Sequence, residues 1–127
     1  VLLLSKTPAA LRQERIVYLD FITCYSKDFG FTENINGRNS VKKSELALRR
    51  KKIQKALQEL VVDGFVCPKD TDEGLFYQIT QDGRIYSEKL SSEYAGKYRI
   101  ISESVSSHFE NNTDKELLDL ILKGAGS

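Results

Sequence analysis

The sequence predicts an α+β domain, mostly α-helical, with the plan of a winged helix-turn-helix and additional C-terminal helices. Two helical segments come first, a hairpin signal follows them, and further helical segments close the chain. This order predicts an N-terminal helix, a helix in the position of a recognition helix, and a β-hairpin wing. We expect residues 1–90 to form the winged-helix core. Residues 91–127 are expected to form a helical extension that packs on the core or on a partner.

The first predicted helix begins at Thr7 and Pro8, because a hydroxyl can cap a helix and proline is tolerated in its first turn. It is expected to end between Ser26 and Gly30, where a polar stretch over residues 28–40 predicts a surface loop. The apolar residues 1–4 predict a strand with no obvious neighbour. The apolar stripe of the helix consists of Leu11, Ile16, Val17, Leu19, Phe21, Ile22 and Cys24.

The second helical region covers residues 40–63 and has the apolar spacing of one helix face. Gly64 predicts its end, since glycine readily adopts the left-handed conformation of a helix cap. No glycine or proline interrupts residues 41–63, which leaves one helix or two helices open. The apolar face comprises Leu46, Ile53, Leu57, Leu60 and Val61.

The hairpin is predicted by the β-prone segments FVC and LFYQIT, which flank a proline and the polar tip KDTDEG. Thr80 then predicts the cap of a helix over residues 81–90. We expect the side chains of Ile85, Tyr86 and Leu90 to face inward from this helix.

Two more helices are predicted near the C-terminus. The first is indicated by apolar residues at helical spacing, namely Tyr94, Tyr98, Ile101 and Val105. The second begins with a capping-box pattern, in which the side chains of Thr113 and Glu116 satisfy each other's backbone N–H groups. It is expected to end at Gly124.

The composition indicates one globular domain, with 127 residues of which 40% are hydrophobic and 29% are charged. No apolar run approaches the ~20 residues that cross a bilayer. The apolar residues 1–4 lack the basic flank and cleavage site of a signal peptide, so we expect a cytoplasmic location. The absence of Met and the start at Val1 indicate that the native initiator is missing.

No catalytic residue, metal site or cofactor is predicted. Cys24 and Cys67 have no histidine or acidic cluster beside them, which favours free thiols over a zinc site or a disulfide. The single histidine, His108, is expected on the surface near a helix end. The glycines are scattered through turns and form no phosphate-binding loop. We therefore expect that the protein is not an enzyme.

The charge is unevenly distributed along the chain. Residues 1–55 contain 12 Lys and Arg against 5 Asp and Glu, whereas residues 56–127 contain 7 against 13. The cations concentrate in residues 38–55, where they can contact double-stranded DNA or an acidic partner, or simply solvate a helix face. The candidate binding residues are Arg38, Lys42, Lys43, Arg49, Arg50, Lys51, Lys52 and Lys55.

Two features argue against a protein that selects a DNA sequence. The wing tip carries Asp70, Asp72 and Glu73 against a single Lys69, and these carboxylates would repel phosphates. The helix before the wing offers few side chains that read bases, while its cations would hold phosphates without choosing a sequence. Non-specific DNA contact is therefore favoured over recognition of an operator.

The last helix carries more apolar residues than one packing face needs, which favours a partner groove over burial in the domain. Tyr94 and Tyr98 are assigned to the same docking surface. The candidate docking residues are therefore Leu117, Leu118, Leu120, Ile121, Leu122, Tyr94 and Tyr98.

Three segments resemble a known family. LLLSKTPAALRQERIVYLDFITCYSKDFG, SELALRRKKIQKALQELVVDGFV and YQITQDG, followed by SSEYAGKYRI, are similar to the middle component of ABC-three-component systems, above all the Lamassu-type prokaryotic defence operons. The resemblance covers residues 2–105. Its motifs SELALRR and SEYAGKY correspond to residues 44–50 and 92–98.

The resemblance implies a non-catalytic winged-helix subunit that works with an SMC-like ABC ATPase and an effector, commonly a nuclease, of the same operon. Such a subunit bridges or regulates its partners in anti-phage and anti-plasmid defence. It implies no membrane association and no catalytic residues. The alternative function is a winged-helix transcriptional regulator, and a small enzyme with His108 as its base is a remote third.

Overall fold

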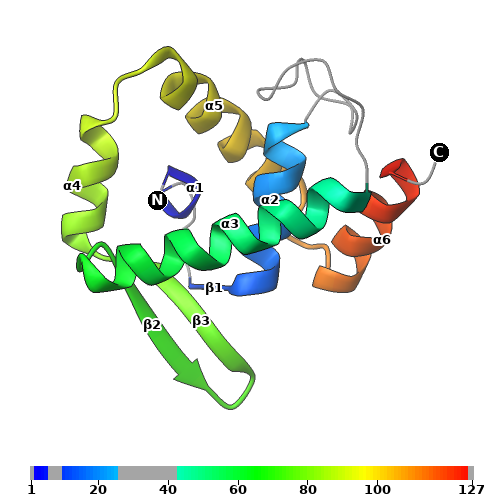
Figure 1. The fold of residues 1–127 in the computed structure, drawn as a ribbon, viewed down its shortest axis with the longest axis horizontal. Helices are drawn as coiled ribbons and strands as arrows, with labels where there is room; N and C mark the ends of the chain where they lie inside the picture. The colour runs from blue at the N-terminus through cyan, green and yellow to red at the C-terminus, as the bar shows by residue number, and fades with distance from the viewer. Residues whose placement is uncertain (1, 6–9, 26–42, 126–127) are drawn as a thin grey trace.

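The computed structural model describes residues 2–5, 10–25 and 43–125. It is mostly helical with one small antiparallel sheet, which confirms the α+β prediction (Figure 1). In chain order the elements are α1 (Leu2–Ser5), β1 (Leu11–Arg12), α2 (Gln13–Cys24), α3 (Lys43–Val62), β2 (Val66–Thr71), β3 (Gly74–Ile79), α4 (Gln81–Lys89), α5 (Glu93–His108) and α6 (Asp114–Ala125).

The predicted hairpin is confirmed as β2 and β3, which pair from Val66 opposite Ile79 to Thr71 opposite Gly74. Gly74 has a φ of 119°, a conformation that glycine adopts without a steric penalty. The hairpin extends outward from the end of α3 (Figure 1). β1 joins the outer side of β3, so the strand order in the sheet is β1-β3-β2.

α2 is the central helix, and its residues 16–24 are all buried. A helix that is surrounded in this way must be apolar on nearly every face. The predicted stripe is therefore confirmed for its members from Ile16 onward. The predicted start was wrong, because Leu11 and Arg12 pair with β3 and the helix begins only at Gln13. Thr7, Pro8 and the predicted loop at 28–40 lie outside the described residues.

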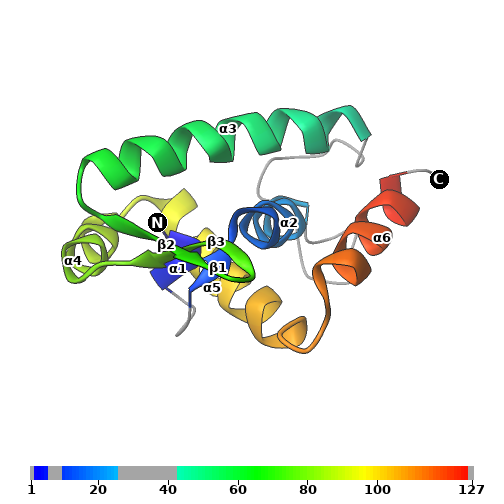
Figure 2. The same ribbon diagram turned by 90° about the horizontal axis from the view of Figure 1, so that it is seen from below.

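α3 is one continuous helix that lies across the other elements, as both views show (Figures 1 and 2). Its predicted end at Gly64 is confirmed, since Gly64 has a φ of 81°. The amides of Gly64 and Phe65 donate to the carbonyls of Val61 and Leu60 at 3.1 and 2.9 Å. These two hydrogen bonds form a Schellman motif, which satisfies carbonyls that the helix end leaves without partners.

Two further predictions were wrong, one of a strand and one of a helix face. Residues 2–5 form a helix rather than a strand, and Leu3 and Leu4 are buried in the core. Ile85 and Tyr86 of α4 are exposed, whereas Gly83 and Ser87 face inward. The physical reason is close packing, since a Cβ added to Gly83 would lie 2.1 Å from the carbonyl oxygen of Phe65. Only the face with small side chains can approach the end of α3 so closely.

The predicted helix caps at Thr80 and Thr113 are confirmed. Thr80 accepts a hydrogen bond from the amide of Gly83 at 3.0 Å. Thr113 and Glu116 exchange hydrogen bonds at 2.9 and 3.1 Å, as a capping box requires. α5 and α6 pack on α2, and their apolar residues join the same core as α2 and α3. None of the helices in the described part of the chain is long and apolar enough to cross a membrane.

Candidate interaction surfaces

The basic run of α3 is divided between two faces of the helix. Arg49 and Arg50 point toward α2 and are partly buried, whereas Lys51, Lys52 and Lys55 are exposed. Of the other predicted cations, Arg38, Lys42 and the side chain of Lys43 lie outside the described part of the chain. The basic surface that the structure describes on α3 is therefore made of three lysines.

Arg49 belongs to a buried cluster that joins three helices. We call Asp20, Cys24, Arg49 and Tyr98 the Asp20 cluster. Arg49 donates to Oδ2 of Asp20 from Nε at 2.9 Å and from Nη2 at 2.6 Å. The Tyr98 hydroxyl donates to Oδ1 at 2.7 Å, and the Cys24 thiol lies 3.9 Å from the same oxygen. One carboxylate thus connects α2 with α3 and α5.

The protonation states of the cluster follow from its burial. Burial lowers the pKa of Arg49, but the Asp20 carboxylate more than compensates, so the pKa lies above its ordinary value. Burial, together with the nearby charge of Asp20, raises the pKa of Tyr98 well above its ordinary value and that of Cys24 to about 12. Both groups are therefore protonated donors at neutral pH. Cys24 is held as a thiol, and a thiol is a poor nucleophile.

Arg50 makes a second, more open ion pair. Its Nη2 lies 3.1 Å from Oε2 of Glu14, and the side chains of the two residues are 34% and 43% exposed. The Tyr18 hydroxyl donates to the same carboxylate at 2.9 Å. Arg49 and Arg50 are thus paired with carboxylates of α2, which corrects the expectation that they form one binding surface with the lysines. The spacing from Leu46 and Ile53 places both arginines on the inner face of the helix.

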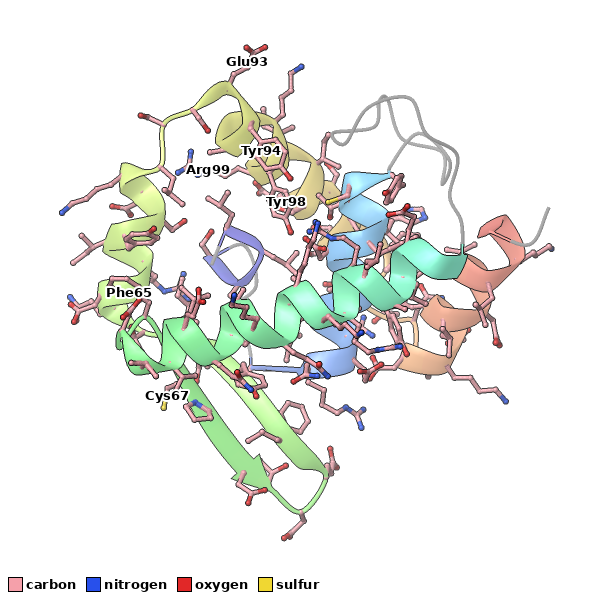
Figure 3. The ribbon with its side chains drawn as sticks, viewed as in Figure 1. Phe65, Cys67, Glu93, Tyr94, Tyr98 and Arg99 are labelled. Carbon is pink, nitrogen blue, oxygen red and sulfur yellow. The ribbon has the colours of Figure 1, made fainter. Side chains whose placement is uncertain are left out.

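A cleft of about 400 Å³ lies between α1, the C-terminal half of α3, α4 and the start of α5. Its walls are mainly apolar and aromatic, and no Lys, Arg or His is among the described residues that line it. Figure 3 shows Phe65 near α4 and Tyr94 and Tyr98 on α5, across the space that α1 partly fills. The lining residues are Leu2, Leu3, Asp20, Ile53, Ala56, Glu59, Leu60, Asp63, Phe65, Tyr86, Leu90, Tyr94 and Tyr98. The sequence analysis did not identify this cleft.

The predicted docking residues are distributed between the core and the surface. Leu117, Ile121 and Tyr98 are buried within the chain, so their assignment to a partner surface is corrected. Leu117 and Ile121 are covered because α6 lies against α2, and Tyr98 is covered because α5 also packs on α2 (Figure 2). Leu118 and Leu120 are half-buried, while Leu122 and Tyr94 are exposed.

An arginine that the sequence analysis missed positions α6. Arg15 of α2 donates to the carbonyls of Phe109 and Asn112, both at 2.7 Å. Its Nη1 also lies 3.1 Å from Oδ1 of Asp114. These contacts satisfy carbonyls at the end of α5 and hold the start of α6 on α2. Single arginines among apolar residues of a buried helix are the signal that could have identified it.

The remaining candidates for chemistry are dispersed. Cys67 is exposed on β2, the carboxylates of the hairpin tip are exposed, and His108 lies in the last turn of α5. Within the described residues no group of three His, Cys, Asp or Glu side chains could hold a metal ion. The arrangement as a whole offers surfaces for contact and a buried cluster that holds helices together.

A family model described as ABC-three component (ABC-3C) system Middle Component 2 matches residues 1–127. Comparisons with curated proteins and with solved structures gave no match.

Proposed function

We propose that this chain is a non-catalytic accessory subunit. It belongs to the family of ABC-three-component system Middle Component 2. In this proposal it bridges or regulates an SMC-like ABC ATPase and an effector, a nuclease, in a Lamassu-type defence system. The observation that carries the proposal is the family match, which spans residues 1–127. A middle component is named for its place in a system of several proteins, and this supports a role in assembly.

The proposal includes a winged-helix architecture. Support comes from the element order, in which α1, β1, α2 and α3 precede the hairpin. It also comes from the sheet order β1-β3-β2, because the first strand of a winged helix pairs with the last. In this arrangement α3 occupies the position of the recognition helix and the β2–β3 hairpin is the wing.

We further propose that Lys51, Lys52 and Lys55 contact double-stranded DNA without sequence preference. These side chains are exposed on the outer face of α3, where phosphates can reach them. Lysine contacts to phosphates supply affinity but no base recognition. The exposed carboxylates Asp70, Asp72 and Glu73 at the hairpin tip disfavour a close fit of the wing to a DNA backbone. Weak, salt-sensitive contact is the expected result.

Co-expression with the neighbouring genes of the operon tests the subunit role. A tagged copy of this chain should co-purify with the ABC ATPase and the effector at a fixed stoichiometry, measured by native mass spectrometry. A chain that purifies alone as a monomer, with both other proteins expressed and soluble, would contradict the proposal.

A further inference from the structure

The cleft beside α3 has an acidic mouth. Glu59, in the last turn of α3, and Asp63, just after its end, both line the cleft and are exposed. Neither of these two carboxylates makes an ion pair with another described residue. No Lys, Arg or His is among the described residues that line the cleft, whereas Glu59 and Asp63 bring negative charge to it.

The walls of the cleft offer an apolar and aromatic surface. Phe65 and Tyr86 stack with ring centroids 4.5 Å apart, and Tyr94 and Tyr98 stack at 6.2 Å. Tyr86 and Tyr94 nevertheless remain 39% and 46% exposed. Arg99 of α5 donates to the carbonyls of Ser87 and Leu90, which fixes the end of α4 against α5 and keeps the two walls in place (Figure 3).

We propose that this cleft docks a basic amphipathic segment of a partner protein. The apolar side chains of that segment lie against the walls, and its Lys or Arg side chains face Glu59 and Asp63. Guanidinium and ammonium groups are also attracted to the faces of exposed tyrosines. A volume of about 400 Å³ accommodates a few side chains rather than a folded domain, which fits a peptide-like segment. The inference rests on the proposed role as an assembly subunit.

The charge of the cleft discriminates against the other occupants. Phosphates of DNA would meet carboxylates, so nucleic acid is disfavoured here. A second copy of this chain would have to present one of its own exposed cations, such as Lys51 or Lys115, and such a head-to-tail contact does not close into a dimer unless its rotation allows it. A basic segment of a different subunit satisfies both the charge and the apolar walls.

Site-specific photo-crosslinking in the co-expressed complex identifies the occupant. A benzoylphenylalanine at Ala56 lies at the cleft, and one at the exposed Gln54 on another side of α3 is the matched control. We expect the Ala56 probe to crosslink to a partner segment that is rich in Lys or Arg and apolar residues, and the Gln54 probe to miss it. Crosslinks to DNA, to a second copy or to an acidic segment would overturn the inference, as would their absence in an intact complex.

Charge reversal measures the energetic contribution. Glu59→Lys combined with Asp63→Lys should weaken binding of the crosslinked partner by roughly tenfold or more, because opposite charges become like charges. Glu88→Lys with Glu110→Lys makes the same change of net charge at exposed positions outside the cleft and should leave binding unchanged. Equal binding by both variants would overturn the inference while leaving the subunit role intact. If the parent chain forms no complex, the proposed function fails and this inference fails with it.

Discussion

The two faces of α3 use the same kind of residue for different purposes. On the inner face, Arg49 and Arg50 pair with carboxylates of α2. On the outer face, Lys51, Lys52 and Lys55 are exposed. In sequence these five cations form one run. In the structure the arginines attach α3 to α2, and the lysines face away from the domain.

The difference shows that a basic run in the sequence gives the number of cations but not the face of the helix on which each cation lies. Arginine suits the inner face, because its planar group can donate several hydrogen bonds to one carboxylate with little loss of conformational freedom. Lysine suits the outer face, since its strongly hydrated ammonium favours water. The exposed basic surface that the structure describes on α3 is therefore smaller than the sequence indicates.

Replacing Arg49 is expected to have the largest effect on stability, and replacing Arg50 provides the comparison. Arg49→Leu leaves Asp20 buried without its cation and should lower the free energy of unfolding by ~3–5 kcal/mol. Arg50→Leu removes a more exposed pair and should cost less than ~1 kcal/mol. Urea denaturation of both variants measures the difference. Adding Asp20→Asn to Arg49→Leu should restore part of the loss, and equal costs for the two single variants would contradict the account of the inner face.

The Asp20 cluster also predicts how stability depends on pH. The pKa of Cys24 rises from an ordinary 9.0 to about 12 on folding, chiefly through burial. Its contribution is therefore complete below pH 9 and is lost as pH rises toward 12, because the unfolded thiol ionises first. Each pH unit in this window removes up to ~1.4 kcal/mol. Denaturation from pH 8 to 11 should show a flatter decline for Cys24→Ala than for the parent, and parallel curves would contradict the prediction.

Two glycine substitutions test the close packing of α4 against the backbone that follows α3. Gly83→Ala places a Cβ against the carbonyl oxygen of Phe65 and should cost ~1–3 kcal/mol, since backbone atoms must move. Gly96→Ala in α5 meets nothing within 4 Å and should stabilise the fold by ~0.5–1 kcal/mol. Opposite shifts in Tm on thermal denaturation would support the close packing of α4 on the backbone of Phe65, just after α3. Shifts of the same sign would contradict it.

Thiol labelling separates the buried cluster from the surface. Cys67 is exposed and should react with a disulfide reagent within the native protein at pH 8, whereas Cys24 is buried and should react only on unfolding. The measurement is the number of protein thiols that react before and after addition of denaturant. Rapid reaction of both thiols without denaturant would show that the Asp20 cluster opens readily.

Much of the fold could be predicted because local chemistry determines it. Gly64, Thr80 and the Thr113–Glu116 pair act within a turn of their own positions, and the structure confirms each of them. The hairpin is predicted in the same local way, by two β-prone segments on either side of a polar tip. By contrast, the strand at Leu11 is only two residues long and exists because β3 lies beside it. No local signal identifies such an element.

The candidate surfaces were harder to predict because they depend on contacts between distant segments. Leu117 and Ile121 are apolar whether they meet a partner or α2, and only the packing of α6 decides between the two. Tyr86 was expected inside, but Gly83 allows the closer approach and turns Tyr86 outward. The cleft gathers residues from α1, α3, α4 and α5. Its carboxylates are ordinary surface residues until the fold brings the aromatic walls beside them.

Fluorescence anisotropy with labelled duplex DNA, at a series of salt concentrations, tests the proposal that the lysines of α3 contact DNA while its arginines hold the fold. The parent chain and Arg50→Ala should bind alike, near the ~10⁻⁴ to 10⁻⁶ M of non-specific binding. The Lys51→Ala, Lys52→Ala, Lys55→Ala triple variant should lose most of this binding and reduce the salt slope by ~3, with its stability nearly unchanged. Equal binding by the triple variant and the parent, or no binding by any of the three, would contradict the proposal.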